Sequence, residues 1–142
     1  MEIVKRGMNM SNKILSDEQL EILKGIGICM IATSGKDNFP HCTIVEPSVY
    51  ENNRIIIPVV QMVTSKKNIE ENKNICLHFY KEDESDPELN VQYKINAEAE
   101  LQFDGDLFWK VKHYEETEVL PEGFFVSAIV VANLKSVEEF VG

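Results

Sequence analysis

Residues 53–75 read NRIIIPVVQMVTSKKNIEENKNI, and the order of apolar and polar residues in this stretch decides the expected fold. The apolar run Ile55–Val60 is rich in β-branched residues, which predicts a buried strand. The polar segment Thr64–Lys67 follows after a short turn and is expected to open a helix that ends near Lys73. The stretch therefore predicts a strand, a turn and a polar helix in direct succession.

The turn between this strand and this helix carries the groups that bind a phosphate monoester. The hydroxyls of Thr64 and Ser65 and the free N–H groups of a first helical turn donate hydrogen bonds, and Lys66 and Lys67 supply positive charge. The same residues are also consistent with an ordinary Thr or Ser helix cap followed by surface lysines. Spacing alone leaves both interpretations open.

The rest of the chain predicts a mainly β domain with peripheral helices. Ser16 and Gln19 have capping-box spacing, which predicts a helix that ends at Gly25–Gly27, and a third helix is expected over residues 106–118. Strands are expected at 28–33, 40–50, 54–60, 74–80, 91–103 and 124–134. Because consecutive strands are linked by turns, we expect a six-stranded antiparallel sheet that closes into a small barrel.

Length and charge exclude several classes of protein. The 142 residues predict a single domain over 1–142, in which polar residues 1–12 form a flexible arm. A net charge of −10 argues against binding to nucleic acid or to an anionic membrane. No apolar run reaches the roughly 18 residues of a membrane span, and no signal peptide opens the chain.

The cysteines and histidines suggest no further chemistry. Cys29, Cys42 and Cys76 are isolated in apolar runs and are expected to be reduced core residues of a cytoplasmic protein, with a redox-active pair as the alternative. The three histidines lack the spacing of zinc ligands, so no metal site is predicted. His41 stands at the start of a strand, where it would cap the turn or reach a cofactor.

Several short sequence motifs follow one another in a characteristic order and spacing. They are Ile55–Pro58, Thr64-Ser65, Asn68-Ile69, Asn72 and Ile75–Leu77, preceded by ATSGKDNFPH at 32–41. In this order the chain resembles the FMN-binding split-barrel family, which includes pyridoxamine 5′-phosphate oxidase, and is most similar to its small FMN-binding proteins. The similarity runs from Leu15 to Phe140 and implies a six-stranded antiparallel split barrel.

The resemblance also implies a cofactor, its site and an assembly. FMN would lie at the interface of a homodimer, with one face covered by the second subunit. Strand 124–131 and the third helix are the interface candidates. By comparison with the family's site, the residues that would line the flavin ring in this chain are Thr43, Ile44, Val45, Glu46, Val59, Val60, Gln61 and Met62. The residues that would bind the phosphate are Thr64, Ser65 and Lys66.

The chain departs from the family in three places. Oxidases of the family carry an Arg-Lys pair where this chain has Thr64-Ser65, and losing a charge-assisted contact would cost ~1.5–3 kcal/mol of affinity. Glu46 would lower the flavin's reduction potential if it pointed inward, and a solvent-facing Glu before Pro47 is the alternative. No arginine follows Arg54, so oxidation of pyridoxamine phosphate is not expected.

Two functional hypotheses follow. The first is an FMN flavoprotein that transfers electrons or acts as a flavin-dependent reductase, with an unidentified redox donor or acceptor. The second is a non-catalytic binding module for FMN, a deazaflavin or haem on the same scaffold, because no general acid–base pair is evident.

Overall fold

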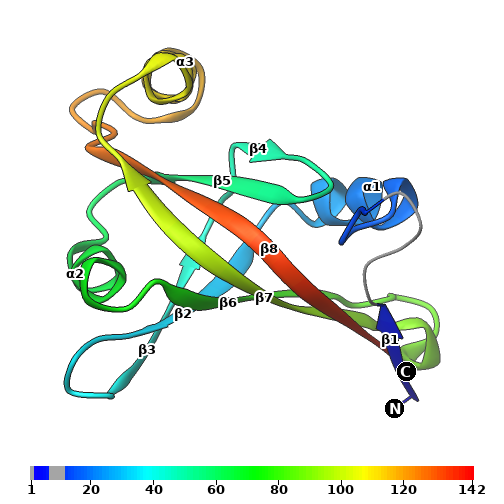
Figure 1. Cartoon of the computed structure of the whole chain (residues 1–142). Coiled ribbons are helices and arrows are strands. Elements are labelled where there is room, and N and C mark those ends of the chain that lie inside the picture. Colours follow the sequence, from blue (N-terminus) through cyan, green and yellow to red (C-terminus); the bar gives the residue numbers. More distant parts are fainter. Residues whose placement is uncertain (1, 7–11) are drawn as a thin grey trace.

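The computed structural model describes the backbone of residues 2–6 and the whole of residues 12–142. One mainly antiparallel β-sheet forms the body, and three helices lie around it (Figure 1). The strands are β1 (Glu2–Arg6), β2 (Cys29–Ser34), β3 (Pro40–Val45), β4 (Val49–Tyr50), β5 (Arg54–Val59), β6 (Asn74–Lys81), β7 (Val91–Gln102) and β8 (Ala128–Val141). The helices are α1 (Asp17–Ile26), α2 (Val63–Glu71) and α3 (Asp106–Tyr114), with a short 3-10 turn η1 (Pro87–Leu89) and a π-helical turn η2 (Glu115–Val119).

The order of the strands explains why the sheet is curved and split. Hydrogen bonds connect them in the order β3-β2-β6-β7-β8-β5-β4, and every pair is antiparallel. The edge strands β3 and β4 are consecutive in the chain, with only residues 46–48 between them. So short a connection brings the two edges of the twisted sheet together, although no ladder joins them. The result is an antiparallel barrel that is open along one line.

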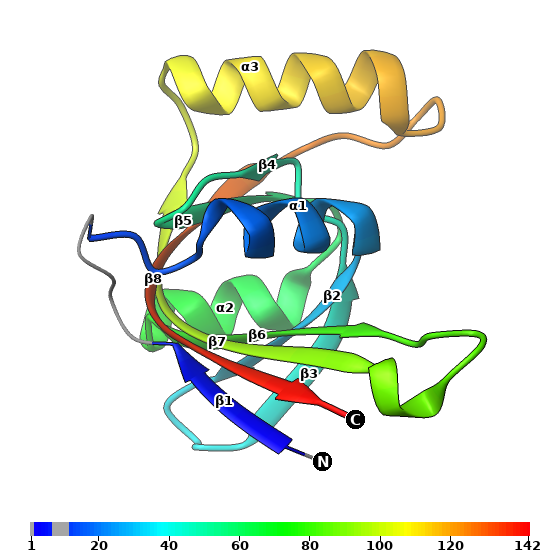
Figure 2. The same cartoon turned by 90° about the vertical axis from the view of Figure 1, so that its right-hand side faces the viewer.

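Two apolar cores lie on opposite faces of β5 and β8. Ile55 and Ile57 point into the main core inside the barrel. Ile56 points the other way, into a smaller core under α3 that includes Phe108 and Ile129. Because both faces of β5 are covered, its apolar run is continuous rather than alternating. Figure 2 shows α3 lying apart from the other helices, above β4 and β5.

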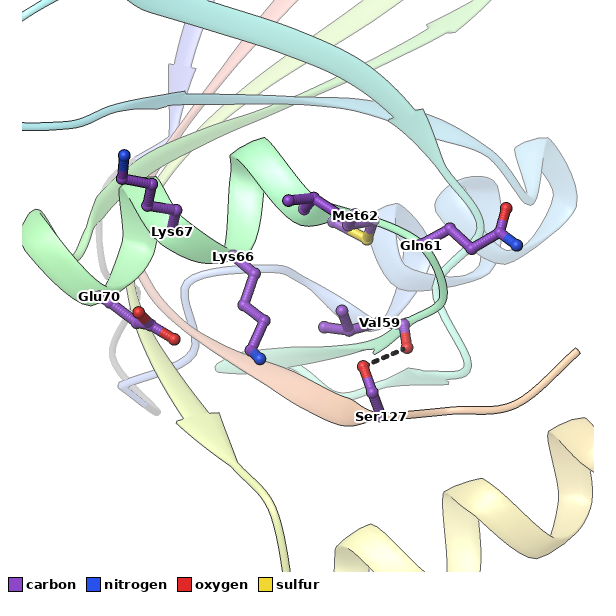
Figure 3. A pocket seen from close by; sticks show the side chains of 8 residues that line it. Val59, Gln61, Met62, Lys66, Lys67, Glu70 and Ser127 are labelled. Carbon is purple, nitrogen blue, oxygen red and sulfur yellow. Dashed lines mark hydrogen bonds between the residues drawn. The ribbon is translucent and has the colours of Figure 1, made fainter.

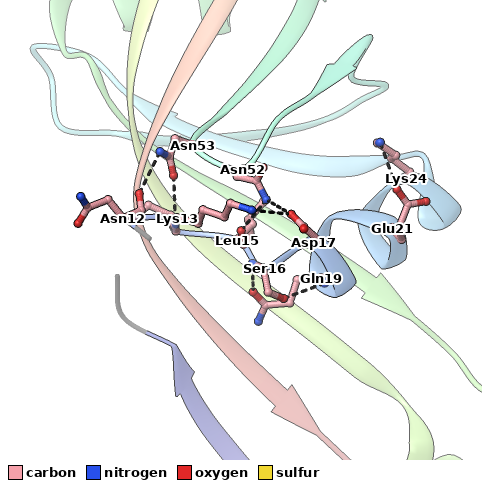
Figure 4. Close-up of polar contacts among 11 residues, drawn as sticks. Asn12, Lys13, Leu15, Ser16, Asp17, Gln19, Glu21, Lys24, Asn52 and Asn53 are labelled. Carbon is pink, nitrogen blue, oxygen red and sulfur yellow. Dashed lines mark hydrogen bonds and ion pairs between the residues drawn. The ribbon is translucent and has the colours of Figure 1, made fainter. Parts of the chain in front are cut away.

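The segment before α1 is held by polar contacts to the turn before β5. Ser16 accepts from the Gln19 N–H at 3.1 Å and the Gln19 side chain accepts from the Ser16 N–H at 3.0 Å, which confirms the predicted capping box (Figure 4). Asn53 accepts from the Ile14 N–H, and Asn52 donates to the Leu15 carbonyl. These bonds hold the start of α1 beside the turn that precedes β5.

Helix α2 is anchored to β2 by its buried polar side chains. The Asn68 amide donates to the Thr33 hydroxyl at 3.1 Å in a buried bond, and Asn72 donates to Ser34 at 3.2 Å. The turn after β2 approaches so closely that a Cβ on Gly35 would lie 2.7 Å from the Asn68 side-chain oxygen. The position of α2, and hence of its first turn, is therefore fixed from β2.

The structure corrects four expectations about the elements. The sheet has eight strands instead of six, and it is not closed. The expected strand 40–50 is broken at 46–48 into β3 and β4, where Pro47 lacks the N–H that a ladder needs. Residues 124–127 precede β8, which instead extends to Val141. The expected arm 1–12 contains β1, which pairs with the end of β8, and residues 1 and 7–11 of that arm lie outside the described residues.

We predict that Thr33→Val destabilises the protein by about 1–3 kcal/mol. The substitution removes the acceptor of the buried Asn68 amide, and a buried donor left without a partner costs its desolvation energy. Urea unfolding followed by circular dichroism measures the change. Ser34→Ala is the matched control, since its bond to Asn72 is only part-buried and its loss should cost less. Equal effects of the two substitutions would contradict this account of the anchor.

Candidate functional site

A cavity of about 420 Å³ lies where α2 begins beside β3. Its volume is in the range of about 300–1,000 Å³ that is usual for ligand pockets. We call it the helix-end cavity, and its lining residues are His41, Thr43, Ile44, Val60, Gln61, Met62, Val63, Thr64 and Ser65. It therefore joins the β3 edge of the sheet to the segment that links β5 to α2.

The first turn of α2 presents hydrogen-bond donors to this cavity. No side chain caps the helix at Met62, so the N–H groups of the first turn have no side-chain acceptor. Ser65 lies in the same turn and is 1% exposed, and its hydroxyl has no hydrogen-bond partner over residues 12–142. A buried hydroxyl without a partner is costly and uncommon, and a ligand acceptor would satisfy it. The helix dipole favours an anionic group at this position.

The link between β5 and α2 has an unusual backbone. Gln61 has a φ of 57°, in the left-handed region that non-glycine residues seldom occupy. This conformation turns the chain from β5 into α2 over three residues and brings Gln61 to the cavity wall. Non-glycine residues held in this region are found at binding sites, where the surrounding structure pays for them.

Two smaller cavities adjoin the helix-end cavity. The lysine cavity, of about 300 Å³, is lined by Val59, Gln61, Met62, Val63, Lys66, Lys67, Glu70 and Ser127 (Figure 3). The glutamate cavity, of about 180 Å³, is lined by Ile44, Val45, Glu46, Pro58, Val60, Met62, Glu115, Val119 and Leu120. Met62 contributes to all three cavities, so they surround one side chain.

The residues that the sequence suggested for a cofactor are distributed over these three cavities. The helix-end cavity contains Thr43, Ile44, Val60, Gln61, Met62, Thr64 and Ser65. The glutamate cavity adds Val45 and Glu46, and the lysine cavity adds Val59 and Lys66. The structure thus brings the two suggested strand segments and the helix start together around Met62.

The suggested phosphate ligands do not share one cavity. Thr64 and Ser65 line the helix-end cavity, whereas Lys66 lines the lysine cavity. The Lys66 ammonium lies 5.3 Å from the centre of the Phe103 ring, a cation–π distance. Figure 3 shows the Lys66 and Lys67 side chains on different sides of α2. Both lysines line the lysine cavity and neither lines the helix-end cavity that Thr64 and Ser65 line.

Sequence reasoning gave little weight to His41 and did not find Glu115. His41 faces the inside of the barrel opposite Thr33 and lines the helix-end cavity. Glu115 is 6% exposed, and its carboxylate accepts from the Ser48 hydroxyl at 2.7 Å. Alternation along 40–45 could have placed His41 inward with Thr43. No local signal distinguishes Glu115 from the other acids of EETEV, because a π-helical turn decides which of them points inward.

The three cysteines differ in exposure, and all are free thiols. Cys29 is buried as expected, and burial raises the pKa of its thiol to about 12. Burial also raises the pKa of the half-buried Cys76 thiol. Cys42 is exposed on the outer face of β3, which corrects the expectation that all three are core residues. Among the residues that the structure describes, no group of His, Cys, Asp and Glu is arranged to hold a metal ion.

The fold and the site define a class of small β-barrel proteins with a ligand cavity beside a helix start. The family model of pyridoxamine 5′-phosphate oxidase matches residues 15–137. The chain therefore belongs to the pyridoxamine 5′-phosphate oxidase family. No curated protein matches the chain.

Solved structures with the same fold are distant in sequence. HupZ of Group A Streptococcus has a TM-score of 0.71 at 16% identity, over 87% of this chain and 91% of that one. An FMN-binding protein of Syntrophomonas wolfei has a TM-score of 0.69 at 13% identity, over 84% and 82% of the two chains. HutZ, a haem storage protein of Vibrio cholerae, has a TM-score of 0.64 at 14% identity, over 89% and 94%. At these identities the likeness establishes the fold alone.

The helices do not suggest a membrane span. Over the residues that the structure describes, no helix is both long enough and apolar enough to cross a bilayer.

We predict that Cys29 is not alkylated by iodoacetamide at pH 8 until the protein unfolds. Its raised pKa keeps the thiol protonated at this pH, and its burial excludes the reagent. Peptide mass spectrometry after labelling with and without urea measures the modification of each cysteine. The Cys29 peptide of the urea-treated sample is the internal control. Complete labelling of Cys29 under native conditions would contradict the buried position of β2.

Proposed function

We propose that this protein binds FMN in the helix-end cavity and acts as a flavoprotein in electron transfer or flavin-dependent reduction. The observation that carries the proposal is the buried Ser65 hydroxyl, which has no partner in the described part of the chain and lies in the uncapped first turn of α2. The flavin-binding relative from Syntrophomonas wolfei, which has the same fold, supports it further.

The residues of the cavity fit the phosphate end of FMN. The Thr64 and Ser65 hydroxyls would donate to phosphate oxygens, together with N–H groups of the first turn of α2. His41 is the titratable group on the β3 side of the same cavity, and its imidazole would supply a further donor. These groups together take the place of the Arg-Lys pair that the oxidases of the family carry.

The strands would hold the ring end. Thr43 and Ile44 on β3 and Val60 after β5 offer apolar side chains and edge-strand backbone groups, which can pair with the polar edge of a heterocycle. Bound flavin supplies the hydride or electron chemistry, and the chain supplies position and electrostatic environment. Glu46 is exposed at the mouth of the glutamate cavity, so solvent screens its charge.

The second candidate is a binding module for haem or a deazaflavin in the same cavity. His41 is the observation that favours haem, because an imidazole in a partly apolar cavity is a common axial ligand of haem iron. HutZ, a haem storage protein, has the same fold. The two candidates differ in one respect: FMN requires the first turn of α2 for its phosphate, whereas haem requires His41.

We also propose that the protein is a homodimer that covers the helix-end cavity. Ile44 and Val63 at the cavity are 67% and 78% exposed, and Met30, opposite Ile44 in the sheet, is 43% exposed. Exposed apolar side chains around a cavity are suited to a self-complementary interface. This rim is a better candidate than strand 124–131, since residues 128–131 are buried within the chain itself.

The proposed setting is the cytoplasm, with a redox partner of unidentified chemistry. Three free thiols, one of them exposed, are compatible with a reducing compartment.

We predict that replacing both Thr64 and Ser65 by Ala weakens FMN binding by ~1–3 kcal/mol, through the loss of phosphate donors. Riboflavin, which lacks the phosphate, should bind the variant and the wild type equally well. Quenching of flavin fluorescence during titration measures both affinities. Thr117→Ala, an exposed hydroxyl outside the cavities, is the control.

The stability of the ligand-free protein is the second readout for this variant. Removal of the unpartnered Ser65 hydroxyl should leave the free energy of unfolding unchanged or slightly raised. If the FMN affinity of the double variant equals that of the wild type, the phosphate does not bind at Thr64 and Ser65. Failure of the wild type to bind FMN, with haem binding that His41→Ala abolishes, would favour the second candidate.

We predict a dimer of twice the 16.2 kDa chain mass in sedimentation equilibrium at micromolar concentration. Met30→Glu should yield monomers, because it places a charge in the apolar rim without entering any of the three cavities. Tyr114→Glu, on the exposed face of α3, is the control and should remain dimeric. If Tyr114→Glu alone yields monomers, the interface lies on α3 instead of the rim. A monomeric wild type would contradict the proposed dimer.

A further inference from the structure

The glutamate cavity is lined by Glu115, for which the described part of the chain offers no cationic partner. Glu115 is 6% exposed, and the hydrogen bond described for its carboxylate comes from the neutral Ser48 hydroxyl. Across residues 12–142, no lysine, arginine or histidine forms an ion pair with it. Buried carboxylates are normally paired with a cation, because an unpaired charge in an apolar surrounding is costly.

The neighbouring acid, Glu116, does have a cationic partner. Glu116 binds the Lys112 ammonium at 2.5 Å and accepts from the Val126 N–H at 2.9 Å. Lys112 also donates to the Val126 carbonyl, so two of its hydrogen bonds go to Glu116 and to the loop before β8. The π-helical turn begins at Glu115 and directs it to the cavity while Glu116 turns to the loop before β8. Single π-helical turns are frequent at functional sites.

The rest of the cavity wall is apolar. Six of its nine lining residues are Ile, Val, Leu or Pro, to which Met62 adds a thioether, and Glu46 at the mouth is a second carboxylate. At about 180 Å³ the cavity is below the range of about 300–1,000 Å³ of drug-sized ligands, so its occupant is small. An apolar wall with a buried acid suits a short hydrocarbon chain that ends in a cationic group.

We propose that the glutamate cavity is a binding site for a small organic cation, an alkylammonium with a short apolar body, whose charge pairs with Glu115. Ser48 holds the carboxylate in place through its hydroxyl, and Val119 and Leu120 enclose the hydrocarbon part. The net charge of −10 raises the local concentration of cations at the cavity mouth. The site does not depend on a flavin in the helix-end cavity, although the two cavities share Ile44, Val60 and Met62.

The test compares three probes of the same length on the ligand-free protein. We expect n-butylammonium to shift the methyl resonances of Val119 and Leu120 and to bind at least tenfold more tightly than n-butanol, while butyrate does not bind. Equal binding of the ammonium and the alcohol would overturn the proposal, as it would show that Glu115 is neutral or that the cavity selects by shape alone. This comparison requires no variant.

Variants then locate the selectivity. Glu115→Gln keeps an oxygen that can accept from Ser48, and it should reduce n-butylammonium binding at least tenfold while leaving n-butanol binding unchanged. Glu118→Gln, an exposed acid of the same turn that lines none of the three cavities, should change neither. If both variants lose the same n-butylammonium affinity, the loss reflects the change in net charge rather than a contact with Glu115, and the proposal is overturned. Repeating the titration after FMN addition separates this site from the proposed flavin site, since ammonium binding without any flavin binding would refute only the latter.

Discussion

The constraint on which the rest of the structure depends is the short connection between the two edge strands of the sheet. β3 and β4 stand at opposite ends of the strand order, yet only residues 46–48 separate them in the chain. The sheet must therefore curl until its edges meet at this point, although the described strand order includes no ladder between them. Every candidate binding feature lies near the resulting opening: the inward side of β3, the end of β5 and the Ser48 contact to η2.

The elements that border the opening carry polar groups that lack a hydrogen-bond or ion-pair partner. Among the residues that the structure describes, no side chain caps the start of α2, none bonds the buried Ser65 hydroxyl, and no cation pairs with Glu115. The unpartnered Ser65 hydroxyl is destabilising in the free protein, since buried polar groups are normally satisfied. Nearby polar groups show that the chain can satisfy such needs, as the Asn68–Thr33 and Lys112–Glu116 pairs do. The unmet groups are therefore best understood as binding capacity, with an anionic group suited to α2 and a cationic group suited to η2.

The two cores explain how the opening keeps its shape without a large surrounding body. β5 is covered on one face by the barrel interior and on the other by α3, so the strand that leads to the site is buried from both sides. The left-handed residue Gln61 then turns the chain sharply into α2. Because α2 is tied to β2 through Asn68, the cavity lies between two elements, β3 and α2, whose positions are fixed by hydrogen bonds to β2.

The sequence by itself determined the family and several local elements, among them the helix that begins after Ser16 and the strand, turn and helix of residues 53–75. The capping box of α1 and the segment 53–75 are short-range signals, because the residues that form each of these elements lie close together in the sequence. Only the tertiary structure decided how many strands the sheet has, that it stays open, and which side chains face one another. Lys66 and Thr64 are neighbours in sequence but line different cavities, because helical periodicity points them apart. Ser48 and Glu115 are far apart in sequence, and they meet because the curled sheet and the π-helical turn bring them together.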